Sequence, residues 1–131
     1  MDRAEKMCCM QPKRYLDMLN QWLILKQEGK SIAEYIRKQG WKMVAVYGMG
    51  IYGRHIIREL SDTECTVAYG IDQKADGEYK GVKILRPTVR LPEVDVVINS
   101  VIYDQNDIEE NLRNVISCPL VSLEDIIYLS Y

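Results

Sequence analysis

The chain has 131 residues, enough for one domain with a single core, and its 47% hydrophobic and 27% charged residues are typical of a globular protein. No apolar run approaches the ~18 residues that span a bilayer, and the first ten residues contain no signal-peptide core, so we expect a cytoplasmic protein without a membrane span. The net charge of −2 does not favour nucleic acid as a partner.

The cysteines and the single histidine, His55, indicate no metal site. The four cysteines include one adjacent pair but no C-x-x-C motif, so neither a zinc site nor a disulfide framework is expected. Because the sequence shows no base to partner a cysteine, a cysteine nucleophile is not expected either.

The first forty residues predict a helical N-terminal extension to a domain that comprises residues 41–131. Apolar residues recur at helical spacing between Pro12, which suits a helix entrance, and Gly29, which suits a stop. Residues 1 to 11 carry no period, and we expect them to be mobile.

A second helix in this extension is predicted to begin at Ser31 and to end at Gly40. The hydroxyl of Ser31 can accept from the N–H of Glu34 while Glu34 reaches back, which is the capping-box pattern. The two helices either cover the sheet of their own chain or form a dimer contact around Trp22.

Three glycines spaced G-x-G-x-x-G, namely Gly48, Gly50 and Gly53, organise the rest of the chain. They follow an apolar run from Met43 to Tyr47, typical of a strand, and they open a helical period from Ile51 to Leu60. A strand, a glycine turn and a helix in this order predict a βαβ unit of the dinucleotide-binding type.

Each glycine has an expected task in that unit. Gly48 makes the tight turn, Gly50 lets the backbone approach a pyrophosphate, and Gly53 lets the helix pack closely on the strand. The phosphate then faces the open N–H groups at the start of the helix, where the sequence has Ile51, Tyr52 and Arg54. The alternatives are a structural turn without a ligand and an Arg54 that is simply exposed.

A second strand is predicted from Cys65 to Ile71, and it ends in Asp72, 19 residues after Gly53. A carboxylate at this place accepts from ribose hydroxyls, and it repels a 2′-phosphate, so NAD is favoured over NADP. Gln73 follows at the same strand end. The alternative is that Asp72 only caps the loop.

Five further elements complete the predicted sheet and its helices. After a loop, a short strand is expected at Val82 to Leu85, and a buried strand at Asp95 to Val101 becomes polar at Asn99 and Ser100. The remaining elements are a helix capped by Asp104 or Asn106, a strand from Pro119 to Ser122, and a terminal helix opened by Ser122 with Asp125.

The predicted fold is a Rossmann-like three-layer α/β fold with a parallel sheet of about five strands in the order 3-2-1-4-5. In such a sheet, ligands bind beyond the carboxyl ends of the strands. The candidate ligand-binding residues are Gly48, Gly50, Ile51, Tyr52, Gly53, Arg54, Asp72, Gln73, Asn99 and Ser100.

The sequence offers little for catalysis. The Tyr-x-x-x-Lys pair of short-chain dehydrogenases and sugar epimerases is absent, and no nucleophilic residue has a recognisable general base near it in the sequence. A binding module is therefore favoured over an enzyme. The alternatives are a fragment of an NAD-dependent nucleotide-sugar oxidoreductase or epimerase, and a protein-interaction domain that keeps the fold without the ligand.

The chain resembles small Rossmann-like domains of bacterial surface-glycan biosynthesis in the order of its segments. These are a two-helix leader followed by VAVYGMGIYGRHIIREL, VAYGIDQ, GVKIL and VDVVINSV. Over residues 43 to 125 the layout is similar to the nucleotide-sugar-binding N-terminal domain of sugar O- and N-acyltransferases, and to stand-alone nucleoside-diphosphate-sugar epimerase-like fragments. The resemblance implies a nucleotide-binding role for Gly48, Gly50, Gly53 and Asp72, with Gln73 near the base or ribose. The hexapeptide repeats that carry acyl transfer are missing, so that activity is not implied.

The resemblance implies a nucleotide ligand, NAD or a UDP-sugar, and a partner enzyme of glycan biosynthesis. The chain also resembles CoA-binding domains, but Asp72 disfavours CoA because that cofactor bears a 3′-phosphate on its ribose. Residues 1 to 60 carry a net charge of +5 and residues 61 to 131 one of −7. Either these are two solvated faces, or they meet in a homodimer to which the leader helices contribute.

Overall fold

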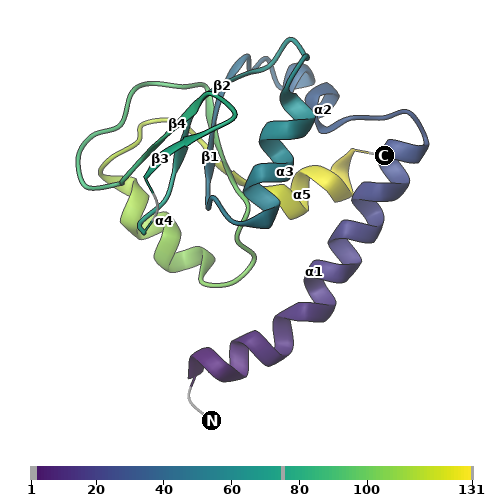
Figure 1. Ribbon diagram of the computed structural model, residues 1–131, viewed down its shortest axis with the longest axis horizontal. Coiled ribbons are helices and arrows are strands. Elements are labelled where there is room, and N and C mark those ends of the chain that lie inside the picture. Colours follow the sequence, from purple (N-terminus) through teal and green to yellow (C-terminus); the bar gives the residue numbers. More distant parts are fainter. Residues whose placement is uncertain (1–2, 75, 131) are drawn as a thin grey trace.

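The computed structural model describes residues 3–74 and 76–130, with side chains from Pro12 onward. Two leading helices precede a strand and a helix, four strands then follow in succession, and a helix, a strand and a last helix end the chain (Figure 1). They are α1 (Arg3–Gln27), α2 (Ile32–Lys38), β1 (Met43–Tyr47), α3 (Ile51–Leu60), β2 (Thr66–Ile71), β3 (Gly77–Tyr79), β4 (Val82–Leu85), β5 (Val96–Asn99), α4 (Gln105–Arg113), β6 (Leu120–Ser122) and α5 (Leu123–Leu129).

The six strands form one mostly parallel sheet in the order β3-β4-β2-β1-β5-β6. The central strand β1 pairs in parallel with β2 on one side and with β5 on the other. The expected α/β class with a parallel sheet and an N-terminal helix is confirmed. The expected strand count of five and the order 3-2-1-4-5 are wrong, because β3 adds an antiparallel edge strand beyond β4.

The extra strand depends on a two-residue turn between β3 and β4. Lys80 and Gly81, the residues of that turn, have φ of +50° and +81°. Two successive residues with positive φ form a tight turn whose twist matches that of an antiparallel pair. Part of the segment expected as a loop, β3, therefore pairs with the expected strand β4 as a hairpin. The hairpin covers what would otherwise be the open edge of β4.

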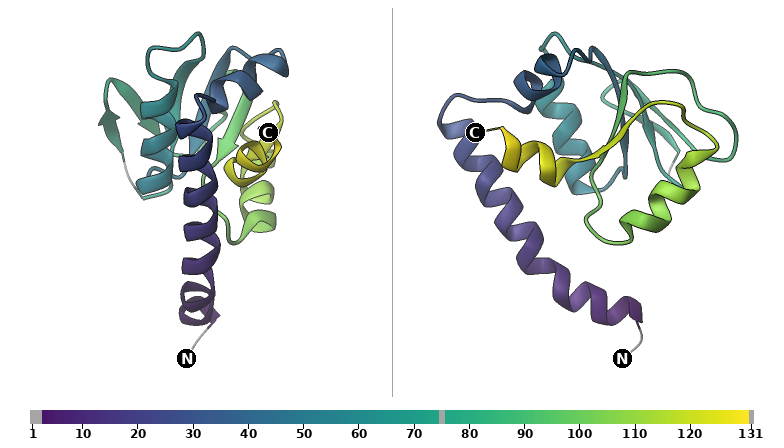
Figure 2. Two further views of the ribbon diagram at one scale, coloured as in Figure 1. Left: turned by 90° about the vertical axis from the view of Figure 1, so that its right-hand side faces the viewer. Right: turned by 180° about the vertical axis from the view of Figure 1, so that it is seen from behind.

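Helices cover both faces of the sheet (Figures 1 and 2). Successive residues of β1 point to opposite faces, as the pleat requires. Val44 and Val46 belong to a core with buried residues of α1, α2, α3 and α5, whereas Ala45 and Tyr47 belong to a second core with α4. The helices of the N-terminal extension therefore share one core with the sheet.

Helix α1 begins at Arg3, so the expected helix start at Pro12 is wrong. Pro12 lies inside the helix, where its missing N–H removes one backbone hydrogen bond without ending the helix. The N-terminal part of α1 extends away from the sheet, while its C-terminal part lies beside α5 (Figure 2). No helix in the described part of the chain is long and apolar enough to cross a membrane.

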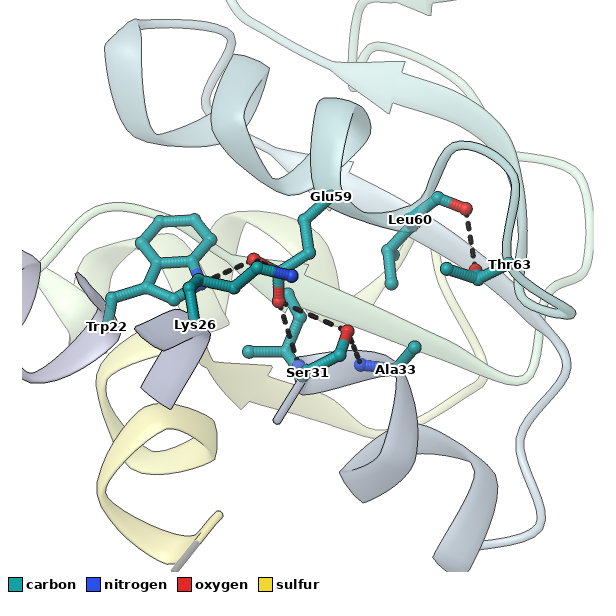
Figure 3. A network of polar contacts seen from close by, with 8 residues as sticks. Trp22, Lys26, Ser31, Ala33, Glu59, Leu60 and Thr63 are labelled. Atoms are coloured by element: carbon teal, nitrogen blue, oxygen red, sulfur yellow. Dashed lines mark hydrogen bonds and ion pairs between the residues drawn. The ribbon is translucent and has the colours of Figure 1, made fainter. Parts of the chain in front are cut away.

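The helices of the extension are tied to α3 through one carboxylate, that of Glu59 (Figure 3). Its oxygens accept from Trp22 Nε1 at 2.9 Å and from the backbone N–H of Ile32 at 2.8 Å, and Lys26 Nζ lies 3.5 Å away. The Ser31 hydroxyl donates to the same carboxylate at 3.3 Å. Glu59 thus joins α1, the start of α2 and α3.

This network corrects the expected capping box of α2. Ser31 is the N-cap, but its hydroxyl oxygen accepts from the N–H of Ala33 instead of Glu34. Glu59, distant in sequence, accepts from the first N–H of the helix. A capping acid supplied by another helix replaces the local one because α3 packs directly on α2.

Candidate functional site

In the glycine turn after β1, two of the three glycines lie too close to neighbouring atoms to carry a side chain. Gly48 has φ of +88°, and a Cβ there would lie 2.6 Å from Ser100 Oγ. A Cβ at Gly53 would overlap the carbonyl oxygen of Gly48, so the helix packs on the turn at a distance only glycine allows. Gly50 differs from both, because a Cβ there would meet nothing within 4 Å.

The open space at Gly50 lies at the N-terminus of α3. Gly50 is the N-cap of this ten-residue helix and has no side chain to cap it. The N–H groups of the first helical turn have no partner within the helix itself, and they carry the positive end of the helix dipole. An oxygen-bearing ligand, and an anion above all, can be bound there.

A cavity of about 880 Å³ opens in front of this turn. One wall is the turn with the strand ends behind it, and the opposite wall is an apolar stretch of α1. The turn side includes Gly48, Met49, Gly50, Ile51, Tyr52, Asp72, Ser100, Val101, Tyr103 and Asp104, and the α1 side consists of Pro12, Tyr15, Leu16 and Leu19.

Tyr15 holds α1 in this position. Its ring stacks on that of Tyr52 with centroids 4.3 Å apart and planes 8° from parallel. The Tyr15 hydroxyl accepts from the backbone N–H of Ile102 at 3.1 Å, and the neighbouring Arg14 makes two hydrogen bonds with Glu124 of α5. The apolar wall of the cavity is thus attached to both α3 and the segment after β5.

Asp72 lies at the carboxyl end of β2, and its carboxylate organises the turn. One oxygen accepts from the backbone N–H of Met49 at 2.9 Å, and the other accepts from the N–H of Lys74 at 2.8 Å. Asp72 lines the cavity as well. The loop-capping interpretation and the ligand-binding interpretation are therefore compatible, because a carboxylate accepts more than two hydrogen bonds.

We expect Asp72→Ala to lower the free energy of unfolding by about 1 to 2 kcal/mol in the absence of ligand. The variant leaves the N–H of Met49 without its acceptor inside a tight turn, and such a loss has about this cost. Urea unfolding followed by circular dichroism measures it. If Asp72→Ala unfolds at the wild-type urea concentration, the two backbone contacts do not support the turn.

A second cavity of about 490 Å³ lies at the same sheet edge, lined by residues of α4 as well as by Gly48, Asp72 and Tyr103. Tyr47 and Gln73 line this cavity, and Gln73 Nε2 donates to the Tyr47 hydroxyl at 3.2 Å. Burial raises the pKa of Tyr47, so its hydroxyl keeps its proton at neutral pH. The two cavities share several walls and meet above the end of β1.

Seven of the ten candidate residues line these cavities: Gly48, Gly50, Ile51, Tyr52, Asp72, Gln73 and Ser100. The other three lie outside the linings. Gly53 lies beneath the turn, and Asn99 is buried, with its Oδ1 accepting from the N–H of Val101. The Arg54 guanidinium lies over the ring of Tyr79, 5.3 Å from its centroid, and so lines neither cavity.

The structure also adds cavity residues that sequence reasoning did not single out. The α1 wall was missed because helical periodicity identifies an apolar face and not what that face covers. Asp104 was expected only as a helix cap. It is the N-cap of α4, but its side chain makes no capping hydrogen bond and it lines both cavities. A positive φ of 53° at this residue is the local sign of an unusual position.

Fold and site together define an α/β protein whose glycine turn, at the carboxyl edge of a mostly parallel sheet, faces a cavity closed by an added helix. Comparison of the chain with protein-family models, with curated proteins and with solved structures finds no match.

Proposed function

We propose that the chain is a binding module for a nucleoside-containing ligand, NAD or a UDP-sugar, held at the glycine turn. The observation that carries this proposal is the unfilled space at Gly50, at the uncapped N-terminus of α3 and beside an 880 Å³ cavity. That volume lies within the range of small-molecule sites. Asp72 stands at the strand end where a ribose hydroxyl pair would be bound.

The cavity walls support binding more than catalysis. Ser100 is the hydroxyl nearest the turn, but it donates to the backbone carbonyl oxygens of Tyr47 and Gly48 at 2.8 and 2.9 Å. A serine held in this way has no base to take its proton.

The proposed role in glycan metabolism, with a partner enzyme of that pathway, rests on the resemblance of the sequence.

A protein-interaction domain is the second candidate, and one observation favours it. Leu16 and Ile51, on opposite walls of the cavity, are 65% and 67% exposed. Large apolar side chains left in water at a cavity mouth are typical of surfaces that bind another molecule. The same exposure serves a ligand with an apolar part, so the ligand experiment separates the two candidates.

We expect NAD or a UDP-sugar to raise the melting temperature by roughly 3 to 6 °C at 100 times its dissociation constant. Such a ligand stabilises the native state by about 2.7 kcal/mol, and a domain of this size converts that energy into a shift of this order. CoA is expected to shift the melt less. Differential scanning fluorimetry measures these shifts.

The matched variant is Gly50→Val, which puts a side chain into the space that a phosphate group would occupy. Gly50 has an ordinary negative φ of −78°, so valine is tolerated there and the unliganded variant folds. We expect the ligand-induced shift to disappear in this variant. If no nucleotide at millimolar concentration shifts the wild-type melt, the binding proposal is wrong and the interaction-domain candidate replaces it.

A further inference from the structure

The apolar wall that α1 adds lies on the side of the glycine turn opposite to Asp72. Strand β2, which Asp72 follows, is on one side of the central strand β1, and β5 and β6 are on the other. Helix α1 is attached on that other side, since Tyr15 accepts from the N–H of Ile102, which comes after β5. Its Arg14 donates to Glu124, which comes after β6. The first cavity therefore extends from a polar end at Asp72, across the turn, to an apolar end beside α1.

The end of the cavity beside α1 has few polar groups. Four described residues of α1 line it: Pro12, Tyr15, Leu16 and Leu19. Among these only Tyr15 has a polar side-chain atom, and its hydroxyl already accepts from Ile102 while its ring stacks on Tyr52. The polar residues after β5, Tyr103 and Asp104, line both cavities and so lie where the two meet. A ligand hydroxyl buried beside α1 would find few hydrogen-bond partners, and an unpaired buried hydroxyl is costly.

Two exposed apolar side chains belong to this end of the cavity, one on each wall. Leu16 of α1 is 65% exposed, and Ile51, the first residue of α3, is 67% exposed. Ile51 directly follows Gly50, so a group attached to a phosphate at Gly50 begins next to Ile51. Covering the two side chains removes apolar surface from water, which favours a ligand whose group at this place is itself flat and largely apolar.

Resting on the proposed function, we infer that the ligand is a dinucleotide of the NAD class rather than a nucleotide sugar. Its first ribose would lie at Asp72 and its pyrophosphate at Gly50. Its second base, a flat ring, would lie between Leu16 and Ile51, with the second ribose near Asp104. Each part of the ligand then meets a wall of matching polarity. A hexose in place of the second base would instead bring its hydroxyl groups against Leu16 and Ile51.

Three ligands that share the ADP half and its pyrophosphate charge test the inference by isothermal titration: NADH, ADP-ribose and ADP-glucose. They differ only beyond the pyrophosphate, so a difference in affinity reports on that part of the site. We expect NADH to bind about tenfold more tightly than either of the other two, because only NADH carries a second base. Its heat-capacity change on binding should also be the more negative, which is the mark of buried apolar surface.

Alanine variants locate the second base. Leu16→Ala removes most of the side chain from the α1 wall, and Leu16 is exposed enough for folding to be unaffected. We expect this variant to reduce the tenfold preference for NADH to about threefold or less, with the affinity for ADP-ribose unchanged within about twofold. Leu23→Ala is the matched control: Leu23 is a 56% exposed leucine of the same helix, but it lines neither cavity. It should leave the preference unchanged.

The outcomes separate this inference from the proposed function. If ADP-ribose or ADP-glucose binds as tightly as NADH, or if Leu16→Ala keeps the full preference, the dinucleotide class is wrong although the chain binds nucleotides. UDP-glucose is titrated as well, and its binding in the absence of binding by the three ADP ligands leads to the same conclusion. If none of the four ligands binds at millimolar concentration, the binding module and the inference that rests on it both fail.

Discussion

Gly53→Val is expected to lower the free energy of unfolding by about 3 kcal/mol and the melting temperature by roughly 10 °C. The Cβ of any residue at this position would overlap the carbonyl oxygen of Gly48, which is backbone and cannot rotate away. Helix α3 must therefore move off the end of β1, and Ile56 and Ile57, which α3 buries, lose packing with it. Thermal and urea unfolding by circular dichroism measure the change.

Gly50→Val is the matched control for this prediction, since it places the same side chain three residues earlier in the same turn. No atom lies within 4 Å of a Cβ at Gly50, so the expected cost is only about 1 kcal/mol, from the poor N-cap propensity of valine. Equal destabilisation by the two variants would mean that α3 does not approach the turn as closely as the structure shows. The same control variant serves as the ligand-blocking variant, so one protein tests both properties of the motif.

Glu59→Ala is expected to lower the free energy of unfolding by about 3 kcal/mol. Its side chain is 7% exposed, and it accepts from Trp22 Nε1 and from the N–H of Ile32. Removing the carboxylate leaves both donors without an acceptor, at about 1 to 3 kcal/mol each, and also removes the ion-pair partner of Lys26. The measurement is urea unfolding, with Trp22 fluorescence reporting the local contact.

Two controls accompany this variant. Glu59→Gln keeps the shape and one acceptor oxygen, so about half of the loss is expected. Glu64→Ala breaks an ion pair with Arg37 whose side chains are mostly in water, and its cost is expected to be about 0.5 kcal/mol or less. If Glu59→Ala costs no more than Glu64→Ala, the carboxylate does not hold the extension to α3, and α1 and α2 are attached through apolar packing alone.

Site residues were predictable where their position depends on the strand that precedes them, and not where it depends on a contact with a residue distant in sequence. Asp72 was placed correctly at a strand end, because the carboxyl ends of parallel strands share one edge of the sheet. Arg54 was expected beside the ligand, but its long side chain reaches Tyr79 of β3, a segment that was expected to be a loop before the strand at Val82 to Leu85. Gly81 was the only residue of the turn whose type favours positive φ, and the positive φ of Lys80 is known only from the structure, so the sequence did not indicate the hairpin of β3 and β4.

The sequence by itself determined the elements that are set by patterns of adjacent residues. Strand β1 and helix α3 begin and end at the predicted residues, because a short apolar run, a glycine turn and a helical period are properties of adjacent residues. The N-cap of α5 is equally local: Ser122 accepts from the N–H of Asp125, as expected.

Only the tertiary structure decided what closes the site. The apolar face of α1 could have covered either face of the sheet or a second chain. The stacking of Tyr15 on Tyr52 and the ion pair of Arg14 with Glu124 place it over the glycine turn. The same holds for Tyr47 and Asp107, which are 60 residues apart in the sequence and line one cavity. Periodicity shows that a face must be buried, but the partner depends on how all the elements pack together.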